Sequence, residues 1–376
     1  MSKRWMQTLA CGVAALVSAA PAFAADTVKL GVAGAHSGEL ASYGQPSLNA
    51  AILVVDEFNA KGGVLGKQVE IVAQDDQCKA EIATNAATRL ISDGVVAVMG
   101  HICSGPCKAS LPLYTNAKLI SMSPSATTPA LTQSGQNPYF FRTIANDNDS
   151  AVVGAQFIVE KLGTPKVAIL HDNSEYGRGY AEKAREELQK SGKAEVVLFE
   201  AVTPGATDYS SAVRKVRQSG AGAIMWGGYY PEASKILSNM HSLEIDIPMI
   251  GPDGLKDTGF VELAGPDAEG VYASGPTDTS SNPLSKHYAE LHQKKFGTAP
   301  GAFFDNAVAA TIALLSAVEN AGATDTDKLV EALRGHEVDT PIGRIKFNEQ
   351  GDAIGVGMSI YQIKDGQYSE VYKGGN

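Results

Sequence analysis

Basic residues and aromatic side chains are both scarce in this sequence of 376 residues. Lysine and arginine number 31 against 41 aspartates and glutamates, which gives a net charge of −10. Nucleic acids and anionic membrane surfaces are bound through clustered lysine and arginine, so this balance argues against both as partners. A hydrophobic content of 44% with 39 glycines fits an ordinary globular fold.

Long apolar runs are also missing, apart from a short one near the N-terminus. The basic pair Lys3-Arg4 is followed by an apolar stretch over Leu9 to Val17 and by the small-residue end Ala22-Phe23-Ala24. This order is typical of a secretory signal peptide, and the apolar core is shorter than the roughly 20 residues that span a bilayer. We predict a signal peptide over residues 1–24, cleaved after Ala24, and an exported protein without direct membrane insertion.

Cysteine is rare, and three cysteines remain after the predicted cleavage: Cys78, Cys103 and Cys107. Export permits a disulfide, and an odd number of cysteines leaves one thiol over. The spacing does not decide which two cysteines pair.

Catalytic and metal-binding motifs are absent as well. The patterns G-x-S-x-G, G-x-x-x-x-G-K-[ST] and G-x-G-x-x-G do not occur. The stretch GHICSGPC places His101 near Cys103 and Cys107, but a structural zinc site needs a fourth ligand. A nucleophile at Ser104 or Cys103 would need His101 as base, and the sequence offers no acid to orient that histidine. We therefore expect no metal, no cofactor and no enzymatic activity.

What the sequence does contain is a regular alternation of strand-like and helical segments. One helix pattern runs from Ser47 to the pair Gly62-Gly63, and another from Ala80 to Ser92. The apolar strand-like segments are 28–33, 69–76, 95–100, 119–123, 166–170, 195–199, 223–228 and 248–254. Strands that alternate with helices of ten to fifteen residues predict βαβ units with parallel sheets. About nine such units are too many for one sheet, so we predict two α/β lobes.

In open α/β sheets, ligands bind beyond the carboxyl ends of the strands. Polar and aromatic residues follow the predicted strands in the segments 100–107, 123–129, 171–177, 227–232 and 251–254. These segments are therefore the candidate binding site.

The chemistry of these segments suits a free α-amino acid. Hydroxyls and backbone N–H groups near the predicted helix starts would donate hydrogen bonds to a carboxylate. They occur at Ser104, Ser125, Ala126 and Thr127. Asp253, in a Gly-Pro-Asp-Gly turn, could meet an ammonium. Aromatic walls for an apolar group would come from Tyr43, Tyr176, Tyr229 and Tyr230.

Each of these residues also has an ordinary structural interpretation. Ser104 and Thr127 are helix-capping residue types, and Asp253 is the usual aspartate of a P-D-G turn. Tyr43, Tyr176 and Phe303 could be core aromatics. These structural interpretations remain open for single residues, and the case for a site depends on their convergence.

Eight stretches together resemble one known family. They are GVAGAHSGELASYG, DEFNAKGGVLGKQVEIVAQDDQC, GHICS, SPSATTPALT, ILHDNSEYGRG, WGGYYPE, IGPDGL and PGAFFDNA. In this order they resemble the branched-chain amino-acid binding proteins of bacterial ABC importers, which are periplasmic binding proteins of the leucine/isoleucine/valine type. The likeness is collinear from about Val28 to Phe347.

The resemblance implies a type I periplasmic binding protein fold, with two Rossmann-like lobes that have parallel central sheets and are joined by three crossover segments. The implied first lobe covers 26–145 and 277–354, and the second covers 146–276 and 355–376. It also implies a periplasmic, monomeric protein whose partners are a small amino acid and the membrane permease of an ABC importer.

The resemblance further assigns roles to matching positions. Ser104 and Thr127 would bind the ligand carboxylate, and the ammonium would meet the Ser125 carbonyl, the Thr127 hydroxyl and Asp253. Tyr229 would come from the second lobe beside Asp253. The side-chain pocket would be lined by Tyr43, Ile102, Cys103, Tyr176 and Phe303. The disulfide of the family maps onto Cys78 and Cys103, which leaves Cys107 without a counterpart.

Two positions depart from the family pattern. The ammonium partner is usually the glutamate of G-P-E-G, whereas this chain has Asp253, which is shorter by one methylene. The family alanine of S-P-A-A-T is Ser125 here, where the expected contact is a backbone carbonyl. The first departure keeps open another ligand, such as an amide or a polar or aromatic amino acid. A sensor role and an exported hydrolase are the alternatives in other classes.

Overall fold

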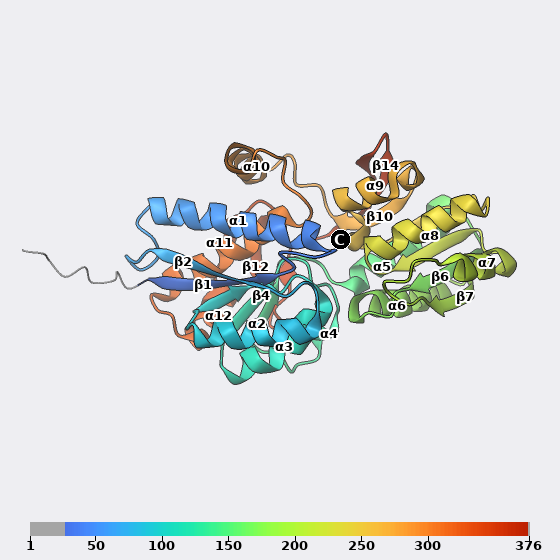
Figure 1. Cartoon of the computed structure of the whole chain (residues 1–376). Coiled ribbons are helices and arrows are strands. Elements are labelled where there is room, and N and C mark those ends of the chain that lie inside the picture. Colours follow the sequence, from blue (N-terminus) through green and yellow to red (C-terminus); the bar gives the residue numbers. More distant parts are fainter. Residues whose placement is uncertain (1–26, 375–376) are drawn as a thin grey trace, which may run out of the picture.

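The computed structural model describes residues 27–374, so the predicted signal peptide over 1–24 lies outside the described residues. Within them the chain forms two lobes side by side, each built on its own sheet (Figure 1). The strands of the first sheet are, in spatial order, β2 (Val69–Asp75), β1 (Val28–Gly34), β3 (Ala97–Met99), β4 (Ile120–Ser123) and β5 (Phe140–Arg142). All of its pairings are parallel, as predicted.

Helices cover both faces of the first sheet, which explains its continuous apolar strands. Ala97 and Met99 of β3 pack with α1 (Ala41–Ala60) and α11 (Phe304–Ala321) on one face. Val98, between them in sequence, packs with α2 (Ala80–Ser92) and α3 (Ser104–Asn116) on the other. The period of two along the strand thus sends alternate side chains to two separate cores.

The second sheet is only partly parallel. Its strands are, in spatial order, β15 (Gln367–Lys373), β14 (Met358–Lys364), β10 (Tyr272–Pro276), β9 (Met249–Gly251), β8 (Ala223–Gly227), β6 (Lys166–His171) and β7 (Glu195–Ala201). The strands from β10 to β7 are parallel, but β14 and β15 join the β10 edge antiparallel. The predicted parallel central sheet is confirmed from β10 to β7, and β14 and β15 add an antiparallel edge to it. The last two strands form a hairpin, and the two strands of a hairpin pair antiparallel.

The second sheet is covered by its own helices (Figure 1). They are α5 (Asp147–Phe157), the π-helix η1 (Ile158–Leu162), α6 (Glu175–Ser191), α7 (Ser210–Ser219), α8 (Tyr230–Ser242), the 3-10 helices η2 (Asp253–Leu255) and η3 (Gly265–Ala268), and α9 (Thr258–Ala264). Additional elements of the first lobe are α4 (Ala130–Gln133), α10 (Pro283–Phe296), α12 (Thr326–Gly335) and a small antiparallel sheet of β11 (Val338–Thr340), β12 (Gly343–Phe347) and β13 (Ala353–Ile354).

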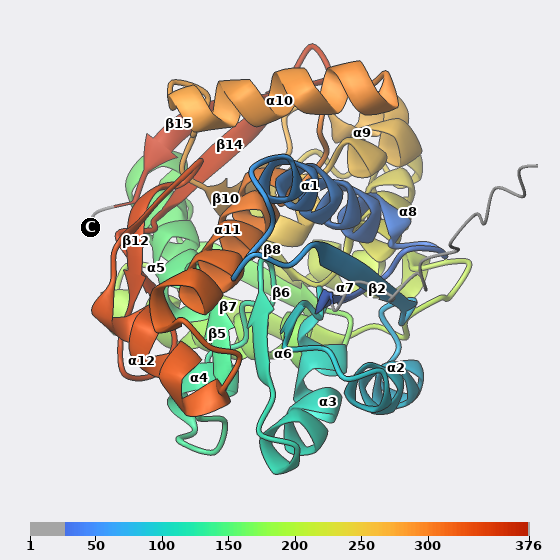
Figure 2. The same ribbon diagram turned by 90° about the vertical axis from the view of Figure 1, so that its left-hand side faces the viewer.

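The chain crosses between the two lobes three times, after β5, after β10 and after β13. After β10 it returns to the first lobe, where α10 and α11 pack beside α1 (Figure 2). The predicted lobe boundaries near 145, 276 and 354 fall in these crossings and stay a prediction.

The helix predicted to begin at Ser47 begins instead at Ala41. The helix includes Gly44 and Pro46, although both residue types are poor helix formers. Gly44 is required because a Cβ at this position would lie 2.0 Å from the carbonyl oxygen of Ala35. The additional turns carry Tyr43 to the boundary between the lobes. The helix predicted over Ala80 to Ser92 is confirmed as α2.

Across residues 27–374, no single helix is both long and apolar enough to cross a membrane. The helices α11 and α12 meet the length and composition criteria only as a pair, and they are bent by 110°.

Candidate functional site

The first-lobe wall of the cleft is built around the start of α3. Cys103 occupies the N-cap position with extended backbone, and its side chain makes no capping hydrogen bond. Ser104 is the first helical residue, and its hydroxyl accepts a hydrogen bond from the Thr128 backbone N–H at 3.4 Å. The helix-capping interpretation of Ser104 is therefore wrong. The N-terminal N–H groups of α3 face the site with the positive end of the helix dipole.

Ser123, at the end of β4, organises the neighbouring loop. Its hydroxyl accepts from the backbone N–H groups of Ser125 at 3.3 Å and Ala126 at 2.9 Å. The expectation of free N–H groups at Ser125 and Ala126 was therefore wrong, because a serine side chain turns back on the following backbone. The Ser125 hydroxyl donates to the Ile102 carbonyl at 2.7 Å. Ser123 was not among the predicted site residues.

A buried histidine braces the same wall from behind. The His101 ring contacts an Asp76 carboxylate oxygen through Nδ1 at 2.6 Å and the Tyr114 hydroxyl through Nε2 at 2.9 Å. Its carbonyl accepts from the Ser123 hydroxyl at 2.5 Å. The sequence suggested no acid for His101, and the structure corrects this with Asp76. Both ring nitrogens are occupied, however, so His101 positions the loop and is not available as a base.

The disulfide predicted between Cys78 and Cys103 is confirmed, with Cα atoms 5.6 Å apart. It ties the loop after β2 to the residue that precedes α3. Cys107 is a buried free thiol that donates to the His101 carbonyl at 3.2 Å, and burial raises the pKa of this thiol. With the Cys103 sulfur in the disulfide, no cysteine nucleophile faces the cleft. Across residues 27–374, no group of three or more His, Cys, Asp or Glu side chains could hold a metal ion.

The second-lobe wall carries acidic and aromatic groups. Asp253 begins η2 and is 1% exposed. One of its carboxylate oxygens accepts from the Tyr176 hydroxyl at 2.5 Å, and that hydroxyl accepts from the Gly254 N–H at 2.9 Å. Burial raises the pKa of Asp253 to about 6, although the hydrogen bond from Tyr176 opposes the shift.

Asp172 positions the aromatic part of this wall. Its carboxylate accepts from the Tyr229 backbone N–H at 3.3 Å and from the Ser174 hydroxyl at 2.7 Å. The Tyr229 ring then lies 5.1 Å from the Tyr176 ring and 6.2 Å from the Tyr43 ring, measured between centroids. Burial raises the pKa of Asp172 to about 6. Asp172 follows β6, which is where a ligand-site residue is expected, but its role is to support the wall.

The two walls touch across the cleft. The Tyr43 hydroxyl of α1 donates to the Gly254 carbonyl at 2.5 Å. The Tyr230 hydroxyl donates to the Glu39 carbonyl at 2.6 Å, and Lys108 forms an ion pair with Glu175 at 2.9 Å. The lobes are therefore closed in this structure.

A cavity lies between the closed walls. It is lined by Tyr43, Ile102, Cys103, Ser104, Ser125, Tyr176, Tyr229, Asp253, Gly254 and Phe303. Every predicted site residue except Ala126, Thr127 and Tyr230 is in this set, and Gly254 is an addition. The volume is only about 20 Å³, which is room for about one water molecule. A larger ligand can enter only if the lobes or the tyrosines move.

Ala126 and Thr127 lie behind the cavity wall. Both are fully buried, and Ala126 packs with Cys107 and Leu111 of α3. The Thr127 hydroxyl is buried without a hydrogen-bond partner in the described chain. It precedes Pro129, the N-cap residue of α4, so it caps no helix. Phe303, in contrast, lines the cavity and has a left-handed backbone (φ 60°), which is unusual for a bulky residue.

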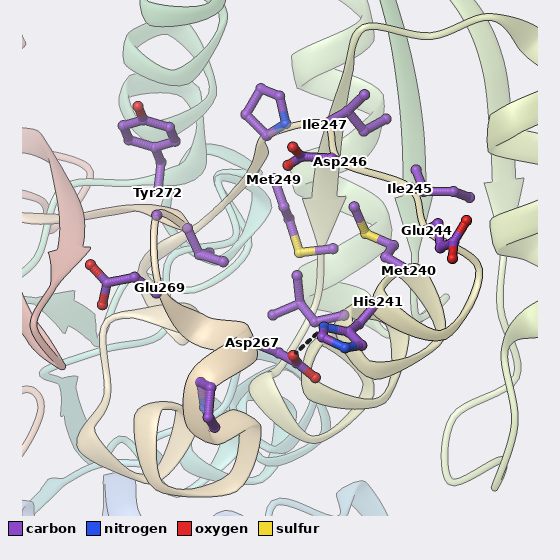
Figure 3. Close-up of a pocket in the computed structure, with 15 residues that line it drawn as sticks. Met240, His241, Glu244, Ile245, Asp246, Ile247, Met249, Asp267, Glu269 and Tyr272 are labelled. Atoms are coloured by element: carbon purple, nitrogen blue, oxygen red, sulfur yellow. Dashed lines mark ion pairs between the residues drawn. The ribbon is translucent and has the colours of Figure 1, made fainter.

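A larger cavity of about 500 Å³ lies elsewhere, where α8 ends and β9 begins (Figure 3). It adjoins the amino ends of β9 and β10, whereas the cleft lies beyond the carboxyl ends of the strands. Its walls include Met240, Met249 and Tyr272, and His241 forms an ion pair with Asp267 at 3.1 Å. It contains none of the predicted site residues.

Two doubly wound lobes, three hinge crossings and a closed interlobe cavity define the type I periplasmic binding proteins, a class of solute-binding proteins. Over residues 27–367 the sequence matches the family profile described as periplasmic binding protein, and the chain belongs to this family.

Named relatives are similar over almost their whole length. The chain is 32% identical over 349 residues to the leucine-, isoleucine-, valine-, threonine- and alanine-binding protein of Pseudomonas aeruginosa, covering 93% of each chain. It is 31% identical to the Leu/Ile/Val-binding protein of Escherichia coli K12, covering 94% of this chain and 95% of that protein. A branched-chain amino acid transporter substrate-binding protein of Streptococcus pneumoniae, solved in complex with isoleucine, superposes with a TM-score of 0.82 at 28% identity, covering 92% and 99% of the two chains.

Proposed function

We propose that this protein captures a free aliphatic L-amino acid, such as leucine, isoleucine, valine or a close analogue, and delivers it unchanged to an ABC permease. The relatives named above bind such amino acids, and the cleft offers the complementary chemistry. The observation that carries the proposal is Asp253, a buried acid that borders a small cavity opposite the N-terminus of α3. An acid facing a helix N-terminus suits a zwitterion, with an ammonium at one end and a carboxylate at the other.

In the proposed binding mode the carboxylate lies at the start of α3 near Ser104 and Thr127. The ammonium meets the Ser125 carbonyl and Asp253. The aliphatic side chain contacts the apolar and aromatic lining provided by Tyr43, Ile102, Cys103, Tyr176, Tyr229 and Phe303. These contacts come from both lobes, so a bound ligand lowers the free energy of the closed form relative to the open form.

The cavity size supports a cycle of opening and closing. With about 20 Å³ between the closed walls, an amino acid has to enter while the lobes are apart. Tyr176 donates to Asp253 in the closed form, so an arriving ammonium takes the place of that hydroxyl as a partner of the carboxylate. We further propose that the protein is a monomer, is exported to the periplasm after cleavage behind Ala24, and catalyses no reaction.

Calorimetric titration of the refolded mature protein with each common L-amino acid tests the proposal. Refolding from denaturant removes ligand carried through purification. We expect heat from leucine, isoleucine or valine at micromolar or lower Kd, and no release of product over hours of incubation. Heat only from polar or aromatic amino acids or an amide would favour the alternative ligands, and no heat from any aliphatic amino acid would overturn the proposal.

A further inference from the structure

Asp147 is a buried acid that neither the resemblance nor the contacts described above explain. It is the first residue of α5, immediately after the first crossing between the lobes. The residue is 0% exposed, its carboxyl oxygens make no close hydrogen bond in the described part of the chain, and the neighbouring Thr127 hydroxyl is the polar side chain that favours its charged form. Buried carboxylates are nearly always paired with a cation or hydrogen-bonded, so a cationic partner is missing from this position.

No cation of the described chain fills this need. Arg142 acts electrostatically on Asp147, but its guanidinium is committed elsewhere. It donates to the carbonyls of Ala126 at 3.2 Å and Thr128 at 2.9 Å, and it forms an ion pair with Asp352 at 2.5 Å. These partners occupy most of its donors. Burial raises the pKa of the Asp147 carboxyl well above its usual range, and the charge of Asp253 raises it further.

Asp147 lies beside the cleft. Its backbone N–H donates to the Thr127 carbonyl at 2.9 Å, and the Thr127 hydroxyl, which also makes no close hydrogen bond, lies near enough to favour the charged form of Asp147. Tyr176 and Tyr229, which line the cavity, have phenol pKa values raised chiefly by burial and in part by the charge of Asp147. Asp147 therefore lies near Asp253 and the cavity, with the Thr127 hydroxyl of the first lobe beside it.

We propose that Asp147 is a second carboxylate partner for the ammonium of the ligand, so that the ammonium is held by Asp147 and Asp253 together. The inference rests on the proposed function and names the ligand group that this side of the cleft selects. A second carboxylate also offsets the shorter reach of Asp253. A cleft with two acids favours ligands with an amino group over otherwise identical acids or amides that lack one.

The proximity of Asp147 and Asp253 affects whether both carboxyl groups can be charged. Asp147 is faced by Asp253 of η2, Arg142 of β5, the Thr127 hydroxyl, and the phenols of Tyr176, Tyr180 and Tyr229. Two neighbouring acids beside one cation whose donors are bonded elsewhere favour the protonated form of one acid while no ammonium is present. Binding of an ammonium at neutral pH then releases that proton.

The test compares leucine with 4-methylpentanoate, which has the same carbon skeleton and carboxylate but no amino group. The variant is Asp147→Asn, which keeps the shape and removes the charge, and the matched control is Asp149→Asn, an exposed acid in the same helical turn. We expect D147N to lose at least about tenfold in leucine affinity by calorimetry, as for a charge-assisted hydrogen bond. The affinity for 4-methylpentanoate, measured by thermal shift at millimolar concentration, should change less than about twofold. D149N should match wild type in both.

Two further readouts separate recognition from a merely structural role. Titrations of leucine at pH 7 in phosphate and in Tris should show proton release by wild type and less release by D147N. The Tm of ligand-free D147N should equal or exceed that of wild type, because no native partner is lost. A lower ligand-free Tm with an equal loss for both probes, or unchanged leucine affinity, would overturn the inference.

Failure of the proposed function is distinguishable from failure of this inference. If wild type binds no aliphatic amino acid, the same comparison is made with the amino acid that gives heat and its deaminated analogue. The proposed function then fails. The role of Asp147 is tested separately by comparing the affinities of D147N and wild type for that amino acid and for its deaminated analogue.

Discussion

The two walls of the cleft differ in how completely their polar groups are satisfied. In the first-lobe wall, Ser123, Ser125 and His101 form hydrogen bonds with one another and with neighbouring backbone groups. A disulfide also links this loop to the loop after β2. On the opposite side the acids Asp253 and Asp147 are buried with few partners. The loop of the first-lobe wall is therefore largely hydrogen-bonded before a ligand arrives, apart from the Thr127 hydroxyl, whereas the opposite acids have few partners.

This difference assigns separate tasks to the two walls. A wall with satisfied hydrogen bonds is rigid, so it presents the N-terminus of α3 in a constant geometry. A wall with under-paired acids is costly in the free protein, and a cationic ligand removes that cost when the lobes close. Affinity and its pH dependence should therefore follow the acids, whereas stability should follow the disulfide-linked loop.

The largest expected effect comes from Asp253→Asn. Removing one partner of a buried charge pair should weaken leucine binding by about 2–5 kcal/mol, measured by calorimetry at pH 7.5. The unfolding free energy should not fall, because the variant removes a buried acid that lacks a cation. The exposed acid Asp246 of the same lobe supplies the control, D246N, which should bind like wild type. Wild-type affinity in D253N would show that the ammonium lies elsewhere.

The pH dependence of leucine affinity tests the same role of Asp253. Because the pKa of Asp253 is raised to about 6, leucine affinity should fall as pH drops through 6, and it should go on rising above pH 6 as far as binding still releases a proton from Asp147. Stability of the ligand-free protein should move the opposite way: the folded acid keeps its proton between about pH 4 and 6, where the unfolded one has lost it, so stability declines as pH rises. Asp172, with a pKa also near 6, contributes to that decline and retains its part in D253N. Leucine affinity that is constant from pH 5 to 8 would contradict this account.

The next effect comes from removing the disulfide of the first-lobe wall. The double variant C78S/C103S should lose about 2–4 kcal/mol of unfolding free energy in a denaturant titration, because the disulfide closes a loop between positions 25 apart. Leucine affinity should fall with it, since Cys103 directly precedes Ser104. The variant C107S, which keeps the disulfide, is the control. An unchanged denaturation midpoint in C78S/C103S would mean that the remaining contacts hold the loop by themselves.

The smallest effect concerns the contact between the walls at the rim. Lys108 and Glu175 have side chains that are 60% and 30% exposed, and exposed ion pairs contribute about 0–1 kcal/mol. Lys108→Ala should therefore weaken leucine binding by less than about fivefold, and the difference should shrink at high salt. Lys183→Ala, which removes an ion pair within α6, should leave binding unchanged. A loss of leucine affinity above about tenfold would show that this ion pair holds the two lobes closed.

Residues that follow strands were predictable because strand order and direction bring them to one edge. Ser104, Tyr176, Tyr229 and Asp253 lie far apart in sequence, yet each follows a parallel strand and each lines the cavity. Supporting residues were not predictable in this way. The Asp76 carboxylate is hydrogen-bonded to the His101 ring although the two residues are 25 positions apart in the sequence. The Ser123 hydroxyl accepts from a backbone N–H group, and no local sequence pattern indicated that contact.

By itself the sequence determined the alternation of strands and helices, the two lobes and most of the cavity lining, because apolar periodicity and the strand-end rule are local signals. Only the tertiary structure decided which hydrogen-bonding groups are satisfied. The hydroxyls of Ser104 and Ser125 found partners, whereas Thr127 and Asp147 did not. The physical reason is that burial and pairing depend on which distant segments meet a side chain, and the crossings between the lobes decide that.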